Sequence, residues 1–137
     1  MKNFLTGAVV LAVSIGVFAA STRSQQPNNT RTFMRAKLDH SQKLLEGLAT
    51  EDFQMISKHS QELSLLSLAA TWQVLQTPEY AQQSLEFRRA VDGVTEAARK
   101  KNLDGAALAY VDVTMKCVNC HKYVRGVRMV KTENGEL

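Results

Sequence analysis

Two cysteines and a histidine stand together near the end of the chain, in the order Cys117-Val118-Asn119-Cys120-His121. This C-x-x-C-H spacing is the attachment signature of a c-type haem. In that chemistry each thiol forms a thioether with one haem vinyl group, and the histidine binds the iron as the proximal axial ligand. Residues three and four positions apart lie on one side of a helix, so the three side chains would project together. The motif predicts one covalent haem c, held by Cys117 and Cys120, with His121 on its iron.

Two other chemistries use the same residue types. Cys117 and Cys120 are the only cysteines, so they could instead form a disulfide or a redox pair. Thioredoxin-like proteins place such a pair after a strand, and no strand pattern precedes Cys117. A zinc site would need further ligands, and His40 and His59, the only other histidines, do not stand at finger-like spacing. Both alternatives are therefore disfavoured.

The N-terminal segment 1–21 is typical of a secretory signal peptide. Lys2 supplies a positive start, an uncharged apolar run extends from Phe4 to Ala19, and small residues stand at the spacing of a cleavage site. The alternative is an uncleaved membrane anchor, although the run is slightly shorter than the roughly 20 residues of a membrane span. Either interpretation predicts a periplasmic or otherwise exported protein, with membrane contact only if the segment is retained. The polar residues 22–30 are expected to form a flexible linker.

Composition sets wider limits on function. The chain has 137 residues, the size of one domain, and its net charge of +4 is too small to argue for nucleic acid as a partner. No catalytic triad, phosphate-binding loop or pair of carboxylates stands out, so the sequence does not predict an enzyme.

Four segments carry apolar residues at helical spacing. They run from Arg31 to about Leu48, from about Glu51 to Leu75, from Pro78 to about Asn102, and from there through the haem motif. The inner face of the first segment is predicted to carry Met34, Leu38, Leu45 and Leu48. Short connections favour antiparallel neighbours, so the fold expected over residues 31–130 is an all-α, up-down-up-down four-helix bundle that encloses the haem. Residues 131–137 are expected to form a polar C-terminal tail.

Polar residues mark the expected starts of the helices. Thr50 is predicted to cap the second helix, with acids in the first turn where the helix dipole favours them. Thr77 followed by Pro78 is a strong start signal for the third helix. Asn102 or Asp104 is expected to cap the fourth.

The chain resembles the class II c-type cytochromes, the cytochrome c′ family and its low-spin relatives, over Arg31 to Arg128. The haem motif lies near the C-terminus, as in that family, and Arg125 follows His121 by four residues, where members often carry a basic residue close to the haem. The run 32–36, TFMRA in the chain, is similar to the first-helix motif in which a methionine of the low-spin members binds the iron. The chain departs from the pattern at Val124, where an aromatic residue is common and Tyr123 lies one place off.

The resemblance leaves three possibilities for the distal side of the iron. Met34 is the first candidate, because a thioether ligand raises the reduction potential and suits a one-electron carrier. The second is an open site, which would make the protein a five-coordinate binder of NO or CO. The third is His59, on the apolar face of the second helix, whereas His40 lies at the edge of the first helix's apolar face.

The expected partners follow from charge and from the resemblance. Lys116, Lys122, Arg125, Arg128 and Lys131 surround and follow the motif, and they fit either a docking surface for an acidic redox partner protein or a solvated helix end. Members of the resembled family often dimerise through their first two helices, so the resemblance also implies that a homodimer could form. Trp72 and Tyr110 are expected to pack in the core or against the haem.

Overall fold

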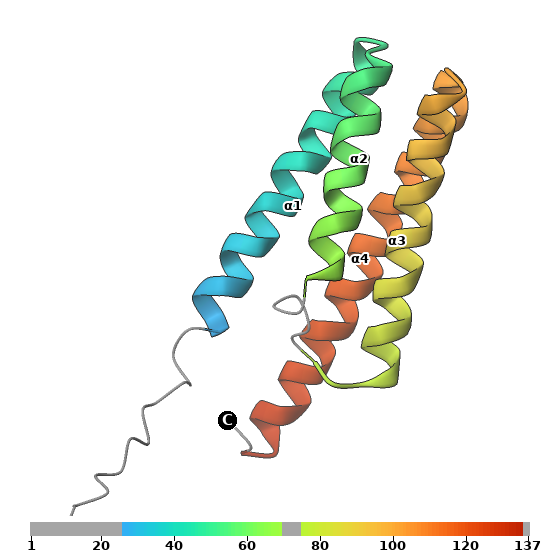
Figure 1. Ribbon diagram of the computed structural model, residues 1–137. Coiled ribbons are helices and arrows are strands. Elements are labelled where there is room, and N and C mark those ends of the chain that lie inside the picture. The colour runs from blue at the N-terminus through green and yellow to red at the C-terminus, as the bar shows by residue number, and fades with distance from the viewer. Residues whose placement is uncertain (1–25, 70–74, 136–137) are drawn as a thin grey trace, which may run out of the picture.

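The computed structural model describes residues 26–69 and 75–135, apart from the side chains of residues 26–29. Four helices occupy this part of the chain: α1 (Gln26–Ala49), α2 (Phe53–Leu68), α3 (Pro78–Arg99) and α4 (Leu103–Glu133). They lie alongside one another as a helical bundle (Figure 1), and the described residues contain no strand. The prediction of an all-α fold is confirmed. The predicted signal segment, residues 22–25 of the predicted linker, Trp72 and the last two residues of the predicted tail lie outside the described residues.

Two helices are longer than predicted. Helix α1 begins at Gln26, so residues 26–30 of the predicted linker are helical; Pro27 is compatible with a first helical turn, where its missing N–H has no partner to lose. Helix α4 continues to Glu133, which takes the first residues of the predicted C-terminal tail into the helix. It ends where Gly135 adopts a φ of +70°, a left-handed conformation that glycine accepts without strain.

The predicted start of the second helix is wrong. The Asp52 carboxylate, not Thr50, caps α2 by accepting the backbone N–H groups of Gln54 and Met55 at 3.0 and 2.9 Å. Glu51 has a φ of 56°, which reverses the chain before Asp52, and the Thr50 hydroxyl still belongs to the end of α1, where it donates to the Glu46 carbonyl. The helix ends at Leu68 and not at Leu75.

The other two predicted starts are confirmed. The Thr77 hydroxyl accepts the Tyr80 N–H at 3.2 Å, with Pro78 as the first helical residue. The Asn102 side chain accepts the Gly105 N–H at 2.9 Å and so caps α4. Each cap satisfies a backbone donor that the first helical turn leaves free.

The buried face of α1 differs from the predicted one. Leu38 and Leu45 are 47% and 55% exposed, whereas Leu44 is fully buried. Helix α1 packs closely on α2 and touches α4 only slightly, so the side that would have faced α4 remains open. The main core is formed by side chains from all four helices. Its fully buried members are Leu44, Ile56, Leu63, Val91, Val94 and Val113.

The separation of α1 from α4 is the feature of the fold that matters for a binding site. Helix α3 packs along both α2 and α4, and the N-terminal end of α1 stands away from α4 in Figure 1. The turns after α1 and after α3 lie at the same end of the molecule, at the top of that view. None of the described helices is both long and apolar enough to cross a membrane.

The cap at the start of α2 gives a direct test of this fold. We expect Asp52→Ala to lower the free energy of unfolding by about 1 kcal/mol, because two backbone N–H groups lose their acceptor. Thr50→Ala should cost less than about 0.5 kcal/mol, as is usual for an exposed position. Urea unfolding followed by circular dichroism measures both free energies. A larger loss for Thr50→Ala than for Asp52→Ala would mean that Thr50, and not Asp52, caps α2.

Candidate functional site

A cavity of about 590 Å³ lies between α1 and α4. Its volume falls within the range of about 300 to 1,000 Å³ that is usual for cofactor and ligand pockets. Helix α1 contributes Met34 and Lys37 to one wall, and helix α4 contributes Cys117, Cys120 and His121 to the other. Apolar side chains of three helices also line it, namely Leu63 of α2, Phe87 of α3 and Val113 of α4. Arg31 and Arg35 of α1 add positive charge to its wall.

The haem motif occupies one side of α4, as its spacing predicts. Both thiols and the imidazole border the same cavity, although Cys120 is buried while Cys117 and His121 are exposed residues at its rim. Cys120 packs with the buried Tyr80 of α3, and Met34 of α1 packs against this pair. Met34 and Cys117 are 83 positions apart in the sequence. The structure therefore brings distant parts of the chain to one site.

The site favours the neutral forms of all three motif residues. Partial loss of water around the imidazole, with smaller contributions from the positive charges of Arg125 and Lys37, lowers the pKa of His121. Desolvation of the sulfur atoms raises the pKa of both thiols, and the Lys37 charge opposes that shift. A neutral imidazole is the form that can bind a metal ion, so His121 is suited to iron at neutral pH.

These residues fit a covalently held haem. The cavity is largely apolar, two thiols stand three residues apart at its wall, and a neutral imidazole stands beside them. A thioether, that of Met34, borders the same space from the opposite helix. This donor set is the one that haem c attachment requires, with one further candidate ligand for the distal side.

The predicted basic cluster is divided by the structure. The Lys116 ammonium borders the cavity and pairs with the Glu86 carboxylate at 3.2 Å, so its charge is largely neutralised. Arg125 does not line the cavity, but its charge acts on His121 one turn earlier. The remaining members of the cluster are exposed along α4: Lys122, Arg128 and Lys131.

His59 lies away from the cavity. Its Nδ1 atom is 2.8 Å from Nδ1 of His40, which joins α2 to α1, and neither ring lines the space beside the motif. One nitrogen must donate and the other must accept, so the hydrogen bond needs at least one neutral ring. Burial and the neighbouring His40 lower the pKa of His59, which favours that state.

Two tyrosines fix the ends of the site. The Tyr110 hydroxyl of α4 donates to the Ser41 carbonyl of α1 at 3.0 Å, one of the few direct ties between these helices. The Tyr123 hydroxyl lies 2.8 Å from the Thr77 hydroxyl, which anchors the α4 segment beyond His121 to the start of α3. Tyr110 borders the cavity, in agreement with its predicted place, and Val124 is half-buried beside Tyr123.

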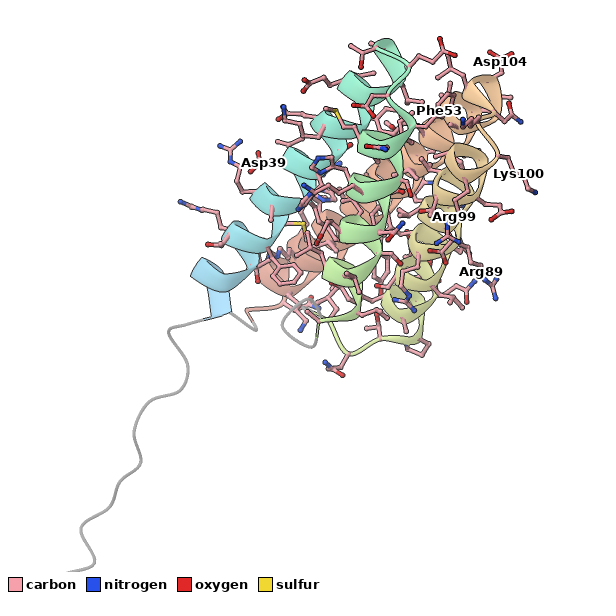
Figure 2. The ribbon with its side chains drawn as sticks, turned by 45° about the horizontal axis from the view of Figure 1, so that its top comes forward. Asp39, Phe53, Arg89, Arg99, Lys100 and Asp104 are labelled. Carbon is pink, nitrogen blue, oxygen red and sulfur yellow. The ribbon has the colours of Figure 1, made fainter. Side chains whose placement is uncertain are left out.

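Lys37 is the site residue that the sequence pattern did not reveal. Only 8% of it is exposed, and its ammonium lies 3.9 Å from the centroid of the Phe87 ring. Burial lowers the pKa of Lys37 to about 7, partly offset by the two cysteines. Other charged side chains, such as Asp39 and Arg89, point outward from the bundle (Figure 2). The one sequence feature that could have indicated the burial of Lys37 is its position seven residues before Leu44, because residues at that spacing lie on the same face of a helix.

The reactivity of the two thiols tests this geometry before any haem is attached. In the reduced, haem-free protein we expect iodoacetamide to modify Cys117 before Cys120, because Cys117 is exposed and Cys120 is buried. Both reactions should be slow at pH 7 and accelerate above pH 9, since the raised pKa values keep the nucleophilic thiolate scarce at neutral pH. Peptide mass spectrometry follows each site, and urea-unfolded protein is the control. Faster modification of Cys120 in the folded protein would contradict the structure.

The chain has no match among protein-family models, curated proteins or solved structures. The candidate haem site is therefore defined by the chain's own residues: the C-x-x-C-H spacing, the shared cavity and the thioether across it.

Proposed function

We propose that this protein is an exported c-type cytochrome that carries one covalent haem c and acts as a one-electron carrier, not as an enzyme. A single observation carries the proposal: both thiols and the imidazole of the motif open into one apolar cavity of about 590 Å³. The bound haem would supply the one-electron redox centre. Export rests on the signal-like segment 1–21.

The residues divide the work of holding the haem. Cys117 and Cys120 would hold the haem through thioether bonds to its two vinyl groups. His121 would supply the proximal iron ligand from α4, and its neutral form needs no proton removed. Arg125 adds positive charge one turn further along, close to the bound group. Leu63, Phe87 and Val113 keep water from the inner side of the cavity.

We place Met34 on the distal side, where its thioether would favour the reduced iron and raise the potential. Its support is that it borders the cavity from α1 while the motif borders it from α4. The proposal includes antiparallel up-down-up-down connectivity, which sets these two helices side by side. The short turns 50–52 and 100–102 are compatible with that connectivity.

A five-coordinate haem protein that binds NO or CO is the second candidate function. The observation in its favour is the weak packing of α1 on α4, which leaves room beside Met34 for a small ligand. The two functions differ only in whether the distal position is closed.

The outer surface of α4 supports the proposed partners. Lys122, Arg125, Arg128 and Lys131 are exposed there and suit an acidic redox protein. A stripe of exposed apolar residues also follows α4, and it is the stronger support for a homodimer: Leu108, Val111, Met115 and Val118.

Covalent attachment is the first test of the proposed function. Protein made in a host that matures c-type cytochromes should carry the added mass of one haem after denaturation. Cys117→Ala with Cys120→Ala should leave the mass of the bare chain, because no thioether can form. Mass spectrometry of denatured protein gives the answer. An unmodified mass for the unsubstituted chain would refute the proposal.

The distal ligand is the second test. The oxidised protein should show the weak near-infrared band of sulfur bound to ferric haem, and its reduced form should bind CO slowly or not at all. Met34→Leu should remove the band while leaving covalent haem intact, since leucine fills a similar volume without a donor atom. Met55→Leu, on α2 and outside the cavity lining, is the matched control and should keep the band. An unsubstituted protein that is high-spin and takes up CO promptly would favour the second candidate function.

A further inference from the structure

Lys37 and Met34 share one face of α1. They stand three residues apart, one helical turn, and both border the cavity that the haem motif borders from α4. Lys37 lines the cavity from α1 and the three motif residues line it from α4, and the Lys37 charge acts to lower the pKa of each motif residue. A four-carbon stem gives this nitrogen more reach than the Met34 sulfur has.

Lys37 is largely removed from water beside the cavity. The residue is 8% exposed, and the Phe87 ring lies 3.9 Å below its ammonium. An apolar macrocycle in the cavity would remove further water from that nitrogen, and loss of water favours the neutral amine over the ammonium. Its pKa of about 7 already makes the neutral amine accessible near neutrality.

We propose that Lys37 is a second distal ligand, whose amine binds the haem iron when the Met34 sulfur does not. The inference rests on the proposed function and extends it from one ligand to a pair on the same helix face. In the exchange, the ammonium releases its proton to water at the mouth of the cavity, the amine lone pair forms the bond to iron, and the sulfur bond breaks. The oxidation state does not change.

The two donors differ in the iron they prefer. A thioether is a soft ligand that favours ferrous iron, whereas an amine is harder and suits ferric iron. Because the two side chains stand one helical turn apart on α1, the proposed exchange calls for movement of side chains only. His59 has no comparable access, because it is hydrogen-bonded to His40 and lies outside the cavity lining.

The experiment compares the ferric forms of holoprotein variants by electron paramagnetic resonance. Met34→Leu should remain low-spin with a nitrogen ligand. Met34→Leu with Lys37→Leu should lose that low-spin signal and become high-spin, because no second donor remains on this face of α1. Met34→Leu with Lys43→Leu is the matched control, because Lys43 lies on the same helix, pairs with Glu46 and does not line the cavity.

A further variant guards against a double variant that fails to fold. Met34→Leu with Lys37→Arg keeps a long cationic side chain that does not lose its proton, so it too should be high-spin. A high-spin Met34→Leu protein, or a low-spin state that survives both Lys37 substitutions, overturns the inference. Covalent haem in those proteins would leave the proposed function standing, whereas absence of covalent haem from every variant and from the unsubstituted chain would remove both.

Discussion

The separation of α1 from α4 is the constraint on which the rest of the site depends. Helix α1 is held mainly by α2, and its ties to α4 include the hydrogen bond from Tyr110 to Ser41. Had α1 packed along α4, the exposed side of Leu38 would be buried and the space beside Cys117 and Cys120 would be filled. Most of the buried apolar side chains instead belong to α2, α3 and the inner side of α4, and a cavity of about 590 Å³ remains between α1 and α4.

That cavity has an unusual composition for an apolar space. It holds a buried lysine, two thiols and a histidine, and the pKa of each is shifted toward its neutral form, mainly by burial. Groups that lose charge in this way remain able to donate electron pairs or to form covalent bonds. The proposed haem would use these donor groups in the apolar part of the cavity, which Arg31, Arg35 and Lys116 also border.

Polar contacts between neighbouring helices hold the bundle in the arrangement that leaves this cavity. Ser60 of α2 and Thr95 of α3 share a buried hydrogen bond of 2.7 Å, so small hydroxyl residues occupy positions where the two helices approach each other. His40 and His59 join α1 to α2, and Glu86 joins α3 to Lys116 of α4. These contacts hold α1 on the α2 side and hold the motif segment of α4 on the α3 side, which keeps the two walls of the cavity apart.

The sequence by itself determined the features that depend on near neighbours in the chain. The all-α class follows from apolar periodicity, the starts at Thr77 and Asn102 follow from short-range caps, and the common side of Cys117, Cys120 and His121 follows from helical spacing. Only the tertiary structure decided which side of α1 is buried, because that depends on the packing of α1 on α2 and its slight contact with α4. The burial of Lys37, the exposure of Leu45 and the pairing of His59 with His40 all follow from that packing, and no local pattern of residues encodes it.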